Sequence, residues 1–298
     1  MSVVIPTRDR PDRLRKAVAA VLEQDYAGPV ECIVVFDRTE EVPLVLPADP
    51  ARSVVTLANH RAQGPAGARN AGADVARSDL LAFCDDDDVW HPHKLRRQVE
   101  ALAGTPDASA VTCGIVVRYG QRSVARVPAR NGVTLDDLIR SRDAAIHTST
   151  LLVRRMDFLD TIGPFDESMP GGYGEDYEWL LRAASRGRLH CVREPLVSVL
   201  WHDASWFDGR WDMIVGSIDR LLELHPEIAR SRPGLGRLFG RLAFAHAAAG
   251  RRREALRWTR RTLALNAGER RAYVAAAVAL GLPASTVLRF AHATGRGI

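Results

Sequence analysis

The sequence predicts an α/β protein, with a sheet flanked by helices in its N-terminal part and an all-helical region at its C-terminal end. Two observations lead to this fold class. Short apolar runs alternate with segments of helical spacing over the first hundred residues, and no strand-like run follows about Trp211. The 298 residues, of which 46% are hydrophobic, suit one large domain or a domain with an appendage.

The first hundred residues predict one half of a doubly wound sheet. The expected elements are, in order, a strand (2–7), a helix (12–24), a strand (31–37), a strand (53–58), a glycine-rich turn that passes into a helix (63–72) and a strand (80–84). Strands that alternate with helices in this way run parallel. Because ligands bind beyond the carboxyl ends of such strands, we expect Asp37 and the run from Asp85 to Asp88 to line one crevice.

Four consecutive carboxylates, Asp85 to Asp88, end the last of these strands in the stretch LLAFCDDDDVW. Like charges at this spacing repel and resist desolvation, so the run is either solvated or bound to a cation. Mg²⁺ and Mn²⁺ take carboxylate oxygens and keep coordination positions for a diphosphate. A solvated loop, or a helix N-terminus that favours negative charge, is the alternative. Val89 and Trp90, directly after the run, indicate packing and favour the cation.

Four segments resemble, in order and spacing, the N-terminal half of the family 2 glycosyltransferases: VVIPTRDRPDRLRKAV, VVFD, GPAGARNAG and LAFCDDDDVWHPHKL. The resemblance covers about positions 2 to 205 and implies the GT-A fold, a Rossmann-like mixed sheet flanked by helices. It also implies that the N-terminal half binds a nucleotide-sugar donor through the strand ends, the turn helix and the Asp-x-Asp motif. The residues that carry this implied role here are Pro6, Thr7, Arg8, Asp37, Arg69, Asn70, Asp85 and Asp86.

The register of the metal ligands within the acidic run stays open. The family's pattern of Asp, variable residue, Asp, Asp makes Asp87 the metal ligand, with Asp88 as its support, while a shift by one residue selects Asp86 and Asp88. Farther on, His202 follows the apolar run PLVSVL, where the resemblance implies a histidine in the metal or diphosphate shell. A lone histidine is equally compatible with a structural role, although imidazole is an acceptable Mn²⁺ ligand. The implied cofactor is Mn²⁺ or Mg²⁺.

The second half of the predicted catalytic domain contains GPFDESMPGGYGEDYEWLLRAASRG, a glycine-rich loop that leads into a helix opened by Glu175 and Asp176. Acids at a helix start also complement the helix dipole without any catalytic role. However, the segment resembles the family's Glu-Asp motif, which implies that Asp176 is the general base, with Glu175 as its neighbour or alternative. The resemblance implies inversion by a single displacement, in which a base takes the proton of an acceptor hydroxyl.

The chain after about Trp211 predicts helices rich in Ala and Arg. The stretch 241–266 resembles one tetratricopeptide-type helix pair with a turn at Gly250, and one such pair is too short for a stable array. We therefore expect a glycosyltransferase domain over 1–210, divided at 104 into a donor half and an acceptor half, and a helical region over 211–298. The helical region is compatible with packing on the catalytic domain, with a homodimer or with an acceptor-facing surface.

Composition sets the expected location. The net charge of +5 fits anionic ligands or a membrane surface and does not by itself indicate nucleic acid. The four cysteines lie singly in apolar stretches and are predicted to be reduced core residues: Cys32, Cys84, Cys113 and Cys191. No signal-like segment precedes Ser2, and no apolar stretch reaches the ~18 residues of a membrane span. The expectation is a cytoplasmic protein, with peripheral contact at the inner membrane surface left open.

Three functions remain to be compared at this point. The first is a metal-dependent inverting glycosyltransferase that uses a nucleoside-diphosphate sugar as donor, and UDP-sugars are the commonest donors in the family. Its acceptor would be a hydroxyl on a glycan, a lipid-linked glycan or a small natural product. The second is a phosphatase of the haloacid dehalogenase type, because Asp85, Asp87 and Val89 satisfy D-x-D-x-[TV]. That motif normally lies on the first strand, which counts against it. The third is a non-catalytic adaptor that binds a nucleotide sugar.

Overall fold

The computed structural model describes residues 1–44, 49–120, 122–142, 145–200 and 209–293. The chain forms two units, each with its own internal contacts. The first unit consists of Met1–Leu135, Asp143–Glu167 and Glu175–Leu200, and the second of Asp136–Arg142, Ser168–Gly174 and Trp201–Ile298. The division into domains at residue 210 stays a prediction.

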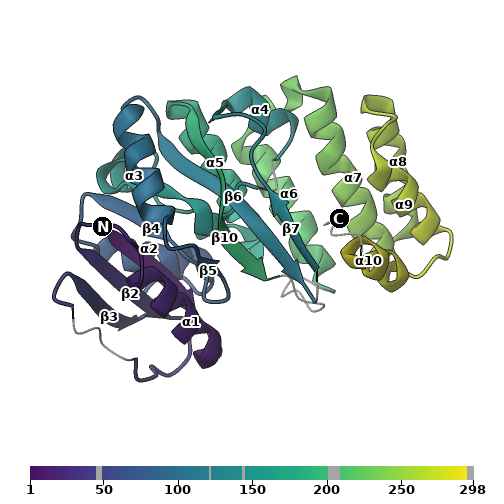
Figure 1. The fold of residues 1–298 in the computed structure, drawn as a ribbon. Coiled ribbons are helices and arrows are strands. Elements are labelled where there is room, and N and C mark those ends of the chain that lie inside the picture. The colour runs from purple at the N-terminus through teal and green to yellow at the C-terminus, as the bar shows by residue number, and fades with distance from the viewer. Residues whose placement is uncertain (45–48, 121, 143–144, 201–208, 294–298) are drawn as a thin grey trace. The chain divides into compact units, whose positions relative to one another are not determined.

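The first unit contains a mixed sheet of ten strands, drawn from purple to green in Figure 1. Its strands are β1 (Ser2–Thr7), β2 (Val30–Phe36), β3 (Arg52–Ala58), β4 (Leu80–Phe83), β5 (Val89–Trp90), β6 (Ala110–Tyr119), β7 (Arg122–Arg126), β8 (Gly132–Val133), β9 (Leu152–Arg154) and β10 (Leu189–Leu200). Their order is β3-β2-β1-β4-β9-β6-β10-β5, with β7 paired to β6 and β8 to β10. The first four strands are parallel, whereas β9 runs antiparallel to β4 and β6. The predicted mixed α/β sheet is confirmed.

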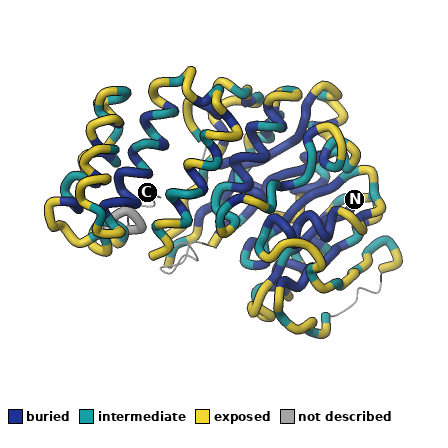
Figure 2. The backbone as a smooth tube through the Cα atoms, turned by 180° about the vertical axis from the view of Figure 1, so that it is seen from behind, coloured by how far each residue is buried: buried dark blue, intermediate teal, exposed yellow. Residues whose placement is uncertain are grey.

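Helices flank this sheet as the sequence pattern predicted. They are α1 (Pro11–Leu22), α2 (Pro65–Val75), α3 (Lys94–Gly104) and α5 (Glu175–Arg186), with short turns η1 (Thr148–Thr150) and η2 (Asp157–Thr161). Helix α2 packs on β1 and β2, and α3 packs on β6 and β10. Figure 2 shows the central strands in dark blue because their side chains are buried on both faces. The four cysteines are buried and free, as predicted.

Strand β1 lies between β2 and β4, and all three run parallel. Their carboxyl ends therefore meet at one edge of the sheet, at the point where the direction of chain progression reverses. Thr7 pairs with Phe36 in the β1–β2 register, and Asp37 follows directly. The acidic run follows β4 at the same edge. This geometry brings together residues that are up to about eighty positions apart in sequence.

An aromatic cluster fixes α5 against the end of β4. Phe83, Phe158, Phe165 and Trp179 have ring centroids 5.2 to 5.9 Å apart in the contacting pairs. Phe83 ends β4, and Trp179 lies on the first turns of α5, where its Nε1 donates to the carbonyl of Gly163 at 2.9 Å. Such a buried cluster, with edge and tilted ring contacts, holds the two elements that carry the acids in a defined relation.

The second unit is helical within its described residues. Its elements are α4 (Leu135–Arg140), η3 (Pro170–Gly172), α6 (Trp211–Leu224), η4 (Pro226–Arg230), α7 (Arg232–Ala248), α8 (Arg252–Leu265), α9 (Arg270–Ala279) and α10 (Ala284–Ala293). The expected helix pair is α7 and α8, and Gly250 between them has φ 77°, a value that favours glycine. Over the described ranges, no helix has the length and apolar content that crossing a bilayer requires.

Candidate active site

The four aspartates form a tight turn between β4 and β5. The backbone N–H of Asp88 donates to the carbonyl of Asp85 at 3.1 Å, which reverses the chain. Asp85 and Asp88 contact the segment that contains η1, whereas Asp86 and Asp87 contact the loop after β1. Trp90 follows the turn and is buried, with the Lys94 ammonium 3.6 Å from its ring centroid. The run is therefore held between packed strands.

Asp86 and Asp87 are tied to the end of β1. Asp86 accepts hydrogen bonds from the Thr7 hydroxyl at 2.8 Å and from the Arg8 backbone N–H at 3.4 Å. Arg10 Nη1 lies 3.2 Å from Asp86 Oδ1 and 2.8 Å from Asp87 Oδ2. Burial raises the pKa of Asp86, with the Thr7 hydrogen bond acting against this effect. Arg10 thus neutralises the outer pair of aspartates, and Asp87 faces this arginine in the structure.

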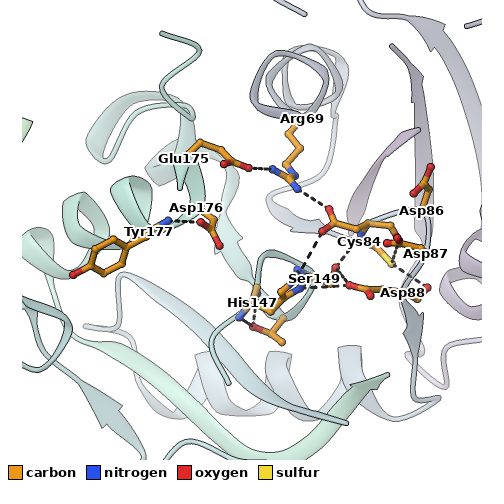
Figure 3. Close-up of polar contacts among 12 residues, drawn as sticks. Arg69, Cys84, Asp86, Asp87, Asp88, His147, Ser149, Glu175, Asp176 and Tyr177 are labelled. Atoms are coloured by element: carbon orange, nitrogen blue, oxygen red, sulfur yellow. Dashed lines mark hydrogen bonds and ion pairs between the residues drawn. The ribbon is translucent and has the colours of Figure 1, made fainter. Parts of the chain in front are cut away.

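Asp85 and Asp88 lie beside a histidine that the sequence did not single out. Asp85, Asp88 and His147 each offer a ligand atom, and these atoms all lie within 4.8 Å of one another. His147 Nδ1 is 3.4 Å from Asp88 Oδ2, and its Nε2 is 4.0 Å from Asp85 Oδ2. The Ser149 hydroxyl donates to Asp88 Oδ2 at 2.5 Å and accepts from the Asp85 N–H at 2.9 Å (Figure 3). Two carboxylates and an imidazole, oriented by a hydroxyl, fit a divalent cation such as Mn²⁺.

The surroundings shift the pKa values of Asp85 and Asp88 in opposite directions. Burial raises the pKa of Asp85, but Arg69 and His147 outweigh burial and leave the pKa below its ordinary value. Burial and the negative charges of Asp85 and Asp87 raise the pKa of Asp88 well above its ordinary value. The Asp88 carboxyl is therefore harder to ionise than a solvated aspartate, because burial and like-charge repulsion in the turn both disfavour its negative form. A cation beside it would favour the ionised form.

Arg69 joins the acidic turn to the first residue of α5. Its Nη2 lies 2.6 Å from Asp85 Oδ1, and its Nη1 lies 2.8 Å from Glu175 Oε1 (Figure 3). The Arg69 side chain is only 5% exposed, and its Nε has no hydrogen-bond partner among the described residues. Burial raises the pKa of Glu175 to about 7, with Arg69 lowering it and the neighbouring Asp176 raising it. The arginine pairs with the buried carboxylate of Glu175 and with the half-buried carboxylate of Asp85.

Asp176 lies next to Glu175 in the first turn of α5, which begins at Glu175 as predicted. The backbone N–H of Tyr177 donates to Asp176 Oδ1 at 2.7 Å. Figure 3 shows Asp176 beside Glu175 and across from the acidic turn. The residue is 9% exposed and is buried like its neighbour Glu175. The start of the helix also favours a negative charge at this position.

Four of the predicted nucleotide-binding residues lie at or just after the ends of β1 and β2: Pro6, Thr7, Arg8 and Asp37. Pro6 and Thr7 close β1, and the Asp37 N–H donates to the Thr7 carbonyl at 2.9 Å. Asp37 Oδ1 accepts from Asn59 Nδ2 at 2.8 Å, and Asp37 Oδ2 accepts from the Gly64 N–H at 3.0 Å. Asp37 therefore ties the end of β2 to the start of α2, which carries Arg69. These contacts hold the ends of β1 and β2 together at the sheet edge where the acidic turn lies.

Asn70 holds the segment that leads toward α5. Its Nδ2 donates to the Phe165 carbonyl at 2.9 Å and to Glu167 Oε1 at 2.8 Å, and its Oδ1 accepts from the Phe165 N–H at 3.0 Å. Glu167 also pairs with Arg61 at 2.6 Å, and its pKa is lowered because these hydrogen bonds outweigh burial. In the structure, the amide of Asn70 thus makes its contacts within the protein, where it positions the Phe165–Glu167 segment.

The structure brings most of the predicted site residues to one sheet edge, but it adds two that sequence reasoning missed. His147 precedes β9 in the stretch IHTSTLLV, and only its place before a strand could have pointed to it. Arg10 lies in the loop after β1, where a surface arginine is ordinary. His202, predicted as a metal ligand, lies outside the described residues.

Comparisons with known proteins add to this geometry. The model for "Glycosyl transferase family 2" matches residues 2–163, which is more than half of the chain. The succinoglycan biosynthesis protein ExoO of Rhizobium meliloti (strain 1021) is 30% identical over 237 residues, which are 75% of this chain and 64% of that protein. The chain therefore spans less than two thirds of the length of this relative.

Two solved structures have a similar fold. TarS of S. aureus (residues 1–349), in complex with UDP-GlcNAc, superposes with a TM-score of 0.61 at 14% identity, over 99% of this chain and 92% of that chain. The mannosyltransferase PcManGT from Pyrobaculum calidifontis, in complex with GDP-Man and Mn²⁺, gives 0.52 at 18% identity, over 99% and 79%. These likenesses bear on the fold and support its GT-A type. The family model matches the chain from β1 through the acidic turn to beyond β9. The chain therefore belongs to glycosyl transferase family 2.

Proposed function

We propose that this protein transfers a sugar from a nucleoside-diphosphate donor to an acceptor hydroxyl, with inversion by a single displacement. The observation that carries the proposal is the buried arginine Arg69, which joins the acidic turn after β4 to the acid pair at the start of α5. An inverting transfer needs a base for the acceptor proton, neutralisation of the departing diphosphate and a fixed geometry between them. This site has a candidate residue for each need.

The donor nucleotide would bind at the ends of β1 and β2. Asp37 lies at this edge, where its carboxylate would accept hydrogen bonds from N–H groups of the nucleobase. Thr7 and Arg8 lie beside it. The reversal point between β1 and its two parallel neighbours is where sheets of this type bind nucleotides. UDP is the proposed nucleotide of the donor, since TarS binds UDP-GlcNAc. PcManGT binds GDP-Man, which makes GDP the next candidate.

Asp85, Asp88 and His147 would hold the divalent cation, because their ligand atoms already lie within 4.8 Å of one another. A bound Mn²⁺ or Mg²⁺ neutralises charge on the diphosphate as it leaves. The family pattern instead selects Asp87 with Asp88. The two candidate ligand sets therefore share Asp88, which is joined by Asp85 and His147 in the first set and by Asp87 in the second. Arg10, which pairs with Asp87, holds the outer side of the turn in either set.

Asp176 is the proposed general base. Glu175 Oε1 is engaged by Arg69 at 2.8 Å inside the protein, so this carboxylate is committed to a structural ion pair. Asp176 lies one residue on, in the first turn of the same helix, where its carboxylate would accept the proton of the acceptor hydroxyl. Glu175 would position this base by fixing the start of α5 against α2.

Donor binding is tested first by thermal unfolding with UDP, GDP, dTDP and CDP, each with and without Mn²⁺. A nucleotide at about a hundredfold over its dissociation constant stabilises by roughly 2.7 kcal/mol, so a shift is easily measured. We expect a shift with UDP that requires the cation. No shift with any nucleotide in either condition would reject the proposed donor site.

Transfer is tested by release of UDP from a panel of UDP-sugars, with a glycan, a lipid-linked glycan or a small hydroxyl compound added as the acceptor, in the presence of Mn²⁺ and of a chelator. We expect release from one donor, lost with the chelator and in Asp176→Asn. A thermal shift without release from any donor would support the non-catalytic adaptor instead. Hydrolysis of a simple phosphate monoester would support the phosphatase, although the acidic run follows β4 and not the first strand.

A further inference from the structure

Helix α8 of the second unit presents a row of arginines to solvent. Its buried residues Ala255, Thr259 and Thr262 lie on one side, where the helix packs on α7 and α9. The opposite side is exposed and contains Leu256 among basic residues, with Glu254 as the helix's acidic residue. The exposed arginines of α8 are Arg252, Arg253, Arg257, Arg260 and Arg261.

None of these five arginines forms an ion pair with any residue that the structure describes, whereas other arginines of the same unit have partners. Arg251 pairs with Asp212, and Arg271 pairs with Glu269 at 2.9 Å. Arg261 stacks over Trp258, with the guanidinium carbon 4.8 Å from the ring centroid. The positive charge of α8 is therefore not balanced within the described part of this unit.

The positive charge of the whole chain is also concentrated in its C-terminal region. Residues 211–298 contain 15 arginines and six acidic residues, whereas residues 1–210 contain 26 basic and 30 acidic residues. The net charge is thus +9 in the C-terminal region and −4 before it, which gives the +5 of the chain. A surface with this concentration of positive charge attracts an anionic partner.

An apolar side chain lies within the basic row. Leu256 is 44% exposed and follows Arg253 by three positions and precedes Arg260 by four, so the three share one face of the helix. A polyanion in solution gains little from an exposed leucine. A bilayer surface binds both features, because arginines reach the headgroups while apolar side chains enter the acyl boundary.

We propose that the exposed arginine face of α8 binds the surface of an anionic lipid bilayer. Each arginine at such a surface contributes about a fivefold gain in partitioning, so three of them together contribute roughly a hundredfold. The inference does not depend on the proposed transferase activity, because it concerns binding alone. Together with that activity, it would bring the site to acceptors carried on lipids.

The test is co-sedimentation of the full chain with vesicles of phosphatidylcholine, alone or mixed with phosphatidylglycerol. The variant Arg253→Gln/Arg257→Gln/Arg260→Gln removes three charges from the face. The control Arg15→Gln/Arg96→Gln/Arg97→Gln removes the same charge from the first unit, at side chains that are 49%, 39% and 44% exposed. We expect binding only to the mixed vesicles, a loss of roughly a hundredfold in the α8 variant and a change of less than about threefold in the control.

Leu256→Ser separates a bilayer from a soluble polyanion. We expect this variant to bind the mixed vesicles several-fold more weakly than the wild type and to bind heparin equally well. Thermal unfolding of each variant checks that the helix is intact. Equal loss in the α8 variant and the control, binding to heparin but not to the mixed vesicles, or no effect of Leu256→Ser on vesicle binding would each overturn the proposal.

Discussion

Arg69 Nη1 lies 2.8 Å from Glu175 Oε1, although 106 positions of sequence separate the two residues. The same guanidinium contacts Asp85 at 2.6 Å, so one buried cation serves both the turn after β4 and the start of α5. Two elements that carry the proposed cation ligand and the proposed base are thereby fixed to α2. A buried charge with two opposite partners is costly to disturb, because either carboxylate left alone stays desolvated.

Arg69→Met should destabilise the protein by about 3–5 kcal/mol, the usual cost of breaking a buried ion pair from one side. Urea unfolding measures the change. The double variant Arg69→Met/Glu175→Gln should recover part of the loss, because it removes one of the two unpaired carboxylates. The matched control is Arg96→Met, whose exposed pair with Asp25 should matter little. Equal stability of the Arg69 and Arg96 variants would contradict the role assigned to Arg69.

The pH dependence of stability should carry the signature of Glu175. Its pKa in the folded protein is raised to about 7 by burial, above the ordinary value of 4.5 that it has when unfolded. Between these two values the folded state binds more protons than the unfolded state, so stability falls as the pH rises through this window. Glu175→Gln removes the titration. Urea unfolding at about pH 5 and about pH 7 should show a smaller fall in this variant than in the wild type. Parallel changes in the two proteins would contradict the prediction, since every titratable group other than Glu175 is present in both.

Asp176→Asn should reduce transfer by at least about a hundredfold, the lower range for losing a general base, while the affinity for UDP stays within a factor of a few. The amide keeps the size of the side chain but cannot take the acceptor proton. Steady-state release of UDP and calorimetric titration of UDP measure the two quantities separately. Glu175→Gln serves as the comparison: if this variant loses transfer while Asp176→Asn retains it, Glu175 is the base.

Metal affinity should distinguish the two ligand sets. Asp88→Asn and His147→Ala should each weaken Mn²⁺ binding at least about tenfold in the presence of UDP, because the first removes the charge of a carboxylate ligand and the second removes the imidazole. Asp87→Asn should weaken it less, since Asp87 faces Arg10. Titration of Mn²⁺ by electron paramagnetic resonance measures free metal without reference to activity. A large loss in Asp87→Asn with an unchanged His147→Ala would favour the register that the family pattern indicates.

The sequence predicted the sheet and the convergence of Asp37 and Asp85 because both rest on local patterns. Alternating apolar strands and helices imply parallel strands, and the ends of β2 and β4 then flank β1. The start of α5 at Glu175 was also predicted, since the glycine-rich loop before it and the helical spacing after it are local signals. These predictions are confirmed as structure, while the roles of the residues stay predictions.

The partners of these residues could not be predicted in the same way. Asp86 meets Arg10 from 76 positions away, and Asp88 meets Ser149 from 61 positions away. Such pairs depend on which loop reaches the sheet edge and on the direction in which a turn points each side chain. A tight turn divides four chemically identical carboxylates into two pairs, and neither spacing nor composition states which pair faces His147.

Gly72→Ala should destabilise the protein by about 2 kcal/mol, within the usual cost of overpacking a core. An added Cβ would lie 2.4 Å from Val4 Cγ1 and 3.1 Å from Val35 Cγ2, in the two strands on which α2 packs. Gly104→Ala is the control, because its Cβ would meet nothing within 4 Å. Val4→Ala should partly rescue Gly72→Ala, as it empties the space that the new methyl needs.

The same substitution should also affect the site, because α2 carries Arg69 three residues before Gly72. A shift of α2 away from β1 moves the guanidinium relative to Asp85, to which it is bound at 2.6 Å. We therefore expect Gly72→Ala to weaken cation-dependent UDP binding as well as stability, and the Val4→Ala rescue to restore both. Calorimetric titration of UDP with Mn²⁺, alongside urea unfolding, measures the two effects. Recovery of stability without recovery of binding would show that the position of α2 does not control the site through Arg69.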